Sequence, residues 1–247
     1  MSLLTIIQAA ADRLGLQRPT AVMTSGDDTV RILRALATQE GRELASRGTW
    51  QRLTREQTFT TVAQSVQTGA IPSDFGHFVN NTIWNYTEQE PLIGPIDPFQ
   101  WQALSASLVA PPDLLFRVRG NDFLILPVPP AGETVKFEYV SAWWVDTDAD
   151  GVGEADAWAA DANTALLPEE IITLGVIWRW LKRNRMAFAD EFTEYTAQVN
   201  QALGRDGAKR IINMGAGEDR ERMRNDYGTR STGGNWENLQ GPWEVLG

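Results

Sequence analysis

Helix-forming patterns near both ends of the chain, with a different pattern between them, constrain the fold most. Apolar residues recur at the three- and four-residue spacing of a helix face over residues 3–14 and 30–44. Far along the chain, Pro168 and two following glutamates predict the start of another helix, and a stripe over residues 188–203 predicts one more. A break near Asn184 separates these two helices, so together they predict a helical hairpin.

The first two helices carry recognisable boundary signals. Ser2 is placed to cap the first helix, and Gly15 lies where that helix should stop. Ser25 followed by Asp28 resembles a capping box for the second helix, which should end near Gly48. These signals predict two short amphipathic helices.

The middle of the chain favours strands and turns. Residues 58–62 (TFTTV) are β-branched and aromatic, and residues 116–126 (FRVRGNDFLIL) contain a turn-forming break, as a hairpin would. Apolar and charged residues alternate over 135–139, which predicts a strand that is buried on one side. Nine prolines between residues 72 and 130 predict long irregular connections between the strands.

These patterns predict an α+β fold with three regions. Residues 1–50 and 165–212 are expected to form one helical bundle, although they lie far apart in the sequence. Residues 51–164 are expected to form an inserted β-rich domain with long loops. Residues 213–247 are rich in Gly, Arg and polar side chains and show no periodic stripe, so we expect a flexible, extended C-terminal tail.

The tail nevertheless keeps several large apolar side chains. A purely solvating segment has little use for tryptophan, so these residues predict anchors that dock on a partner. The alternative is that the tail packs back on its own domain or stays free. The predicted partner-binding residues are Tyr227, Trp236, Trp243, Val245 and Leu246.

Composition excludes several kinds of chemistry. The chain has no cysteine and a single histidine, His77, which excludes disulfide frameworks, thiolate zinc sites and Cys/His nucleophiles. A net charge of -10 argues against a surface that attracts nucleic acid by bulk charge. The 32 acidic residues could include a hydrolytic pair, but the sequence nominates no such pair. We therefore predict no catalytic residues, no cofactor and no metal.

One acidic stretch resembles a calcium-binding loop. Asp146, Asp148 and Asp150 alternate before Gly151, as oxygen ligands do around a hard cation. The position that should supply a bidentate carboxylate is instead Ala157. A solvent-exposed turn selects the same residues, because Asp side chains bond their own backbone and glycine accepts a positive φ. The plain turn is the favoured interpretation, and a calcium-dependent binding module remains the alternative.

The first residues, MSLLTIIQAAADRLG, lack the basic leader and cleavage site of a signal peptide. The sequence also lacks an apolar run long enough to cross a bilayer. We therefore expect a soluble, intracellular protein without a membrane partner.

The order of these signals, over residues 1–212, resembles that of the head-to-tail connector, or adaptor, proteins of tailed bacteriophages. None of the distinctive segments is a catalytic signature, so the resemblance concerns an architecture. These segments are Pro72-Ser73-Asp74-Phe75, Pro91-Leu92-Ile93-Gly94-Pro95, Tyr139-Val140-Ser141, and Leu167-Pro168-Glu169-Glu170 leading into Trp178-Arg179-Trp180.

The resemblance implies a structural virion protein and not an enzyme. Such adaptors form a dodecameric ring under the portal at the neck of the virion, line the channel for the passing genomic DNA without binding it specifically, and attach the next tail or nozzle protein. A C-terminal tail in related proteins grips the portal, which is the role expected of residues 213–247. Assembly would take place in the host cytoplasm. A tail-associated peptidoglycan hydrolase is the enzymatic alternative.

Overall fold

A computed structural model describes residues 2–207 of the 247-residue chain. The described part contains five α-helices and antiparallel sheets, which confirms the predicted α+β class. The helices are α1 (Leu3–Leu14), α2 (Asp28–Ser46), α3 (Pro98–Ala106), α4 (Glu169–Arg183) and α5 (Ala189–Asp206). The strands are β1 (Thr54–Thr60), β2 (Val66–Gln67), β3 (Phe75–Phe78), β4 (Trp84–Asn85), β5 (Glu90–Pro91), β6 (Leu115–Arg119), β7 (Asp122–Leu126), β8 (Thr134–Ser141), β9 (Val145–Asp146) and β10 (Thr164–Ala165).

The boundaries of α1 confirm both sequence signals, whereas the start of α2 does not. Ser2 and Thr5 form a reciprocal capping box, and Gly15 ends α1 in the left-handed conformation with φ 67°. The cap of α2 is Asp27, whose carboxylate accepts a hydrogen bond from the amide of Thr29 at 2.8 Å. The predicted cap, Ser25, was therefore wrong, because the nearer carboxylate takes the free amide.

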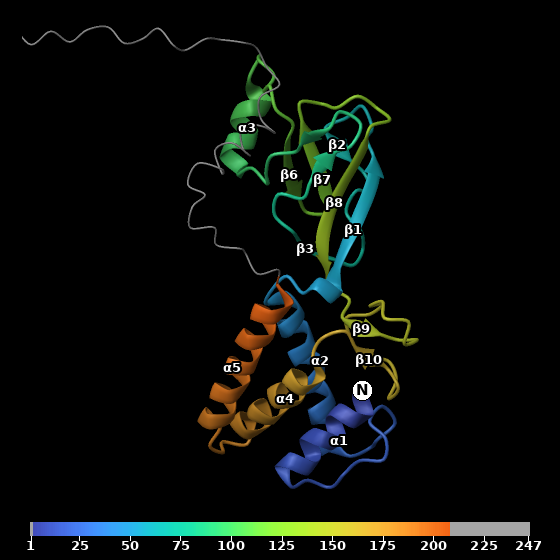
Figure 1. The fold of residues 1–247 in the computed structure, drawn as a ribbon, viewed down its shortest axis with the longest axis vertical. Coiled ribbons are helices and arrows are strands. Elements are labelled where there is room, and N and C mark those ends of the chain that lie inside the picture. Colours follow the sequence, from blue (N-terminus) through green and yellow to red (C-terminus); the bar gives the residue numbers. More distant parts are fainter. Residues whose placement is uncertain (1, 208–247) are drawn as a thin grey trace, which may run out of the picture. The chain divides into compact units, whose positions relative to one another are not determined.

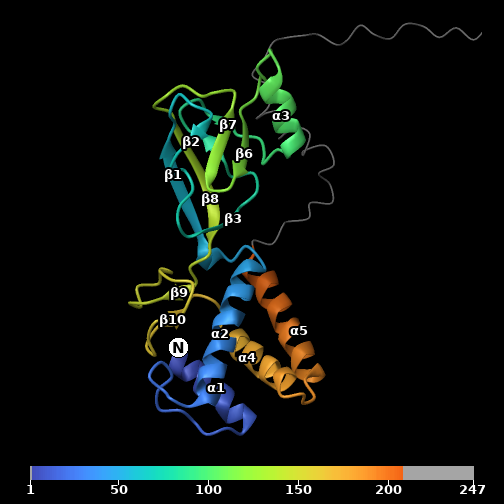
Figure 2. The same ribbon diagram turned by 180° about the vertical axis from the view of Figure 1, so that it is seen from behind.

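The start and end of α4 follow the predicted charge pattern. Pro168 occupies the cap position, two glutamates fill the first turn, and Lys182 and Arg183 fill the last turn. The helix buries most of its length and packs against α1, α2 and α5. Figures 1 and 2 show α1, α2 and α5 gathered around α4. The following helix, α5, continues to Asp206, three residues beyond the predicted stripe over residues 188–203.

The four helices share one hydrophobic cluster, to which the segment between β8 and α4 also contributes. Trp144 from this segment is fully buried, and its ring meets that of Trp158 edge to face at a centroid distance of 5.0 Å. The Trp144 indole lies so close to Gly41 on α2 that any Cβ at that position would collide with it. Glycine at position 41 is therefore required by packing, and the indole anchors the segment to α2.

The largest sheet is built around β8. This strand pairs with β1 along its length, from Thr54 opposite Val140 to Thr60 opposite Thr134, and with β3 and β4 on its other edge. A second sheet has the order β2-β7-β6, and β9 pairs with β10. A two-residue turn at Gly120 joins β6 to β7, as the predicted hairpin requires, with φ 63° at that glycine.

A second hydrophobic cluster lies between the two larger sheets and combines aromatic with aliphatic side chains. Val135, Phe137 and Tyr139 of β8 are buried, which confirms the predicted alternation. The rings of Phe116 and Phe123 stack at a centroid distance of 5.3 Å, and Phe123 stacks on Phe137 at 6.0 Å. Burying each such side chain contributes about 1.5–3 kcal/mol, so these stacked rings hold the two sheets together.

Two predictions for the middle of the chain need correction. The segment expected to be irregular contains α3, which begins behind an Asp97 cap with Pro98 at its first position. The strand expected at residues 58–62 is β1, which starts earlier, at Thr54, and ends at Thr60. Just beyond this end, the Thr61 amide still donates to the carbonyl of Glu133 at 2.8 Å, and its hydroxyl donates to the carbonyl of Pro130 at 2.6 Å.

Candidate functional site

The residues predicted to dock on a partner lie outside the described residues. The described part ends at Gly207, directly after α5, whereas the predicted anchors are Tyr227, Trp236, Trp243, Val245 and Leu246. Their docking role therefore stays a prediction.

The acidic loop brings together Asp146, Asp148 and Glu154, whose carboxylate oxygens lie within 4.8 Å of one another. The sequence suggested Asp150 as the third member of this set. Asp150 instead accepts a hydrogen bond at 2.7 Å from the backbone amide two residues further on. Glu154 joins the group because the loop folds back, so that its carboxylate accepts from the amide and the hydroxyl of Thr147.

The loop is also a self-supported turn. Asp146 is buried, and its carboxylate accepts hydrogen bonds from the amides of Ala149 at 2.6 Å and Gly151 at 3.0 Å. Gly151 has φ 88°, which only glycine adopts without strain. These bonds match the turn interpretation, in which Asp side chains satisfy local backbone amides. The three clustered carboxylates also offer the oxygen ligands that calcium prefers.

A buried ionic network joins α2, α4 and α5. Glu40 is fully buried, forms an ion pair with Arg179, and accepts a hydrogen bond from the Tyr195 hydroxyl at 2.6 Å. Arg179 also contacts Glu43, at 2.6 Å. Burial raises the pKa of the Glu40 carboxyl, against the opposing effect of Arg179. Burial and the hydrogen bond to Glu40 together raise the pKa of Tyr195.

A second buried network centres on Asp74, next to β3. Its carboxylate accepts from the Tyr139 hydroxyl at 2.9 Å, the Ser141 hydroxyl at 2.7 Å and the Arg55 guanidinium at 2.9 Å. Burial, reinforced by the Asp74 carboxylate, raises the pKa of Tyr139 to about 12. Two of the distinctive segments, residues 72–75 and 139–141, therefore meet at one carboxylate.

The buried carboxylates of residues 2–207 all accept hydrogen bonds from neighbouring groups of the chain. Glu133 accepts from the Asn85 side chain at 2.7 Å, and Glu40, Asp74 and Asp146 have the partners described above. A buried charge that is fully bonded in this way orders the fold around it. These four acids are accordingly structural groups.

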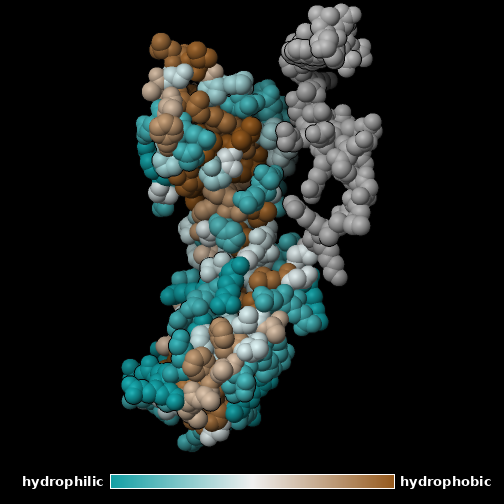
Figure 3. All heavy atoms as spheres, turned by 90° about the vertical axis from the view of Figure 1, so that its left-hand side faces the viewer, coloured by the Kyte–Doolittle hydropathy of each residue, from teal (hydrophilic) through white to brown (hydrophobic). Residues whose placement is uncertain are grey.

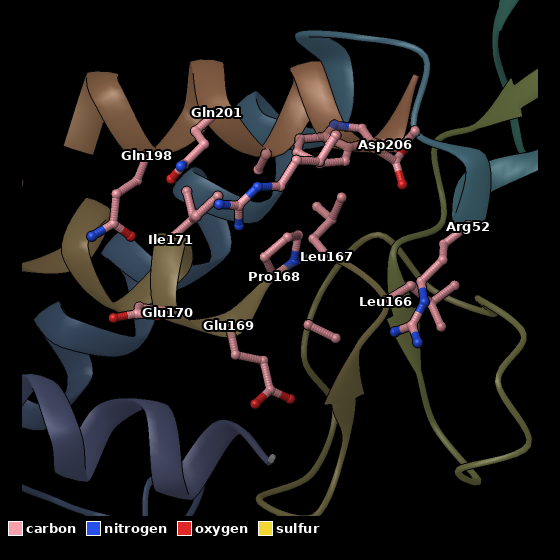
Figure 4. A pocket seen from close by; sticks show the side chains of 14 residues that line it. Arg52, Leu166, Leu167, Pro168, Glu169, Glu170, Ile171, Gln198, Gln201 and Asp206 are labelled. Atoms are coloured by element: carbon pink, nitrogen blue, oxygen red, sulfur yellow. The ribbon is translucent and has the colours of Figure 1, made fainter. Parts of the chain in front are cut away.

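A polar pocket of about 810 Å³ lies between the first turn of α4 and the end of α5 (Figure 4). Its lining includes the distinctive segment 167–170, together with Gln198 and Gln201 of α5 and Arg52. Asp206 lines it too and accepts a hydrogen bond from the amide of Gln51 at 2.7 Å. The last described residues, at the end of α5, therefore lie beside this pocket.

The strand-rich region also exposes an apolar surface. Figure 3 views the molecule from the side of α3 and shows hydrophobic side chains gathered over this region. The exposed fractions are 81% for Phe99, 104% for Leu108 and 77% for Val109. An apolar groove of about 410 Å³ runs between β3 and β6, and the half-buried His77 and Arg117 line it. His77 thus lies in a groove wall.

Sequence reasoning missed both buried networks, although one left a signal. Glu40 lies on the same buried face of α2 as Leu33, Ala37 and Leu44. A charged residue therefore occupies a core position. A charge at such a position requires a buried partner. Asp74 carries no comparable periodic signal, because its partners are 19 to 67 residues away in the sequence.

No helix among the described residues is both long enough and apolar enough to cross a membrane. No curated protein matches the chain. The family model described as "SU10 adaptor protein" matches residues 1–230, a span that includes Tyr227 and ends before Trp236. The chain therefore belongs to the SU10 adaptor protein family, a structural family of bacteriophage head-to-tail adaptors.

Proposed function

We propose that this protein forms a ring under the phage portal, lines the channel through which the genome passes, and attaches the tail below. The family match over residues 1–230 is the observation that carries this proposal. The bonded state of the buried carboxylates supports a structural role, because Glu40, Asp74 and Glu133 join distant parts of the chain and Asp146 supports its own loop. Subunits would assemble in the host cytoplasm and remain at the neck of the virion.

The three regions would divide this work. Residues 1–50 and 165–212 would form the helical bundle, residues 51–164 would supply contact surfaces between neighbours, and residues 213–247 would reach the portal. A net charge of -10 suits a channel wall, since excess carboxylate weakens contacts with phosphate and lets DNA slide. Passing DNA would then be a neighbour without specific contacts.

The tail would dock through its apolar anchors. Ordering a free segment costs about 1–2 kcal/mol for each residue that is fixed, so a few desolvated side chains must dominate the affinity. Trp236 and Trp243 offer the largest buried areas, and Tyr227, Val245 and Leu246 would add to them.

Portal binding by the purified chain tests this function. We expect the full chain to be captured by its portal protein, and a chain truncated after Met214 to remain folded but lose capture. Replacing both Trp236 and Trp243 with alanine should weaken capture at least about tenfold, whereas Tyr86→Ala, at an exposed aromatic of the described part, serves as the matched control. Unchanged capture of the truncated chain would refute the docking role of the tail.

A further inference from the structure

The segment from Ile93 to Pro112, which contains α3, is unusually exposed and almost uncharged. Only Asp97 carries a charge among these twenty residues, and only Trp101 of α3 is buried. Phe99, Leu108 and Val109 lie largely in solvent. Contiguous exposed apolar surface with few charges marks the centre of a protein interface, because each charge placed there would lose its hydration.

The apolar groove between β3 and β6 contains one unusual group. Arg117 is half-buried in its wall, and among residues 2–207 its guanidinium has no hydrogen bond or ion pair. The other lining residues include Phe75, Phe78 and Val118. A matching occupant must therefore be apolar and must bring a carboxylate to the guanidinium.

The same chain carries such a segment at the end of α3. Leu108-Val109-Ala110-Pro111-Pro112 is followed by Asp113, which is exposed and has no ion pair within the described part of the chain. Pro95, Ile96 and Pro98 of the groove lie at the start of α3, at the opposite end of the helix from this tip. Asp113 also lies four residues before Arg117, up to about 13 Å along an extended strand, and the two side chains form no ion pair within one copy.

We propose that the tip, residues 108–113, inserts into the β3–β6 groove of a second copy of this chain, where Asp113 pairs with Arg117. The two patches are different, so the contact is head to tail, and such contacts form a closed ring when the rotation between subunits allows it. This inference rests on the proposed ring and identifies the contact that builds it.

The absence of cysteine allows a direct test by cross-linking of the full chain. We expect the double variant Leu108→Cys/Val118→Cys, treated with a short bismaleimide, to give a ladder of dimers, trimers and larger species. The test is made at high protein concentration and again on the portal, and a ladder in either setting supports the contact. Each single variant should give no ladder, because residue 108 faces residue 118 of the neighbour. No ladder in either setting, or efficient dimers from a single variant, would overturn the proposal.

Charge reversal then tests the predicted ion pair within the cross-linking background. Asp113→Arg and Arg117→Asp should each reduce the ladder about tenfold or more, and the combined reversal should restore it. Arg119→Asp, on the same strand but outside the groove lining, is the matched control and should leave the ladder unchanged. A ladder that survives both single reversals, or one that depends on Trp236 and Trp243 in place of Asp113, would overturn the proposal.

Portal capture separates this inference from the proposed function. If the charge reversals leave the ladder intact while the portal still captures the chain, the contact is wrong and the adaptor role stands. If the unmodified chain neither associates with itself nor binds the portal, the adaptor role fails as well.

Discussion

The helical region and the strand-rich region both bury a charged network, but they differ in the apolar surface that they expose. The helices enclose an ion pair, Glu40 with Arg179, in the middle of their core. The sheets enclose the Asp74 network together with stacked phenylalanine rings, and they leave an apolar segment around α3 in solvent. A buried ion pair requires matched neighbours and so restricts packing, whereas exposed apolar surface is available for contacts with other molecules. We infer that the first region sets geometry and the second makes contacts.

The largest test breaks the ion pair in the helical core. Arg179→Met should lower the free energy of unfolding by about 3–5 kcal/mol, because Glu40 would remain buried without its cation. Chemical denaturation measures this loss. The exposed pair between Arg42 and Asp156, each about half in solvent, provides the comparison, and Arg42→Ala should cost less than about 1 kcal/mol.

A second variant sharpens the interpretation of that loss. Glu40→Leu combined with Arg179→Met removes both charges and should recover a large part of the stability. If the double variant is no more stable than Arg179→Met alone, an unpaired buried charge is not the cause.

A smaller effect is expected in the strand-rich region, at Tyr139. Tyr139→Phe removes one hydrogen bond to Asp74 and should cost about 1–2 kcal/mol at neutral pH. The pKa of Tyr139 is raised from 10.0 to about 12 in the folded protein, so the folded state holds this proton more tightly than the unfolded state does. The contribution of the Tyr139 hydroxyl to the free energy of unfolding is therefore complete below pH 10 and is lost as the pH rises through about 12.

Chemical denaturation at several alkaline pH values checks the direction of this pH dependence. The difference in stability between the parent protein and Tyr139→Phe should shrink from pH 10 to pH 12. Tyr86→Phe, at a tyrosine that is 56% exposed, is the control and should show no such trend. A difference that grows with pH would contradict the assignment.

The smallest effect is expected at the acidic loop. Asp146 already accepts two backbone amides, so added calcium should shift the melting temperature by less than about 1 °C relative to chelator. Scanning calorimetry with and without the ion measures the shift. A rise of several degrees that disappears in Glu154→Gln would instead establish a calcium site.

Local signals predicted the parts of the fold that depend on neighbouring residues. Ser2, Gly15 and Pro168 mark helix ends because each acts on backbone groups within one turn. The helix α3 was missed because prolines flank it and it buries little besides Trp101, so it shows no apolar stripe. The early start of β1 was missed because its first residues are polar and gain their place only by pairing with β8.

The candidate sites depended on contacts that a single sequence does not encode locally. The carboxylate group in the acidic loop includes Glu154, which joins through the fold of the loop and not through the alternate spacing of the aspartates. Asp74 gains its role from partners on β1 and β8. The resemblance to a family identified the distinctive segments, and the structure supplied the reason that two of them occur together.

The central place of α4 among the helices has a consequence during synthesis. The helices α1 and α2 leave the ribosome more than a hundred residues before α4, which is the surface that they bury against. Likewise, β1 emerges long before its partner β8. A nascent chain that stops short of Ser141 therefore carries two unfinished cores, and one that ends between Ser141 and residue 183 still lacks the helix that completes the first. We expect the nascent chain to need chaperone protection until the last third of the protein is translated.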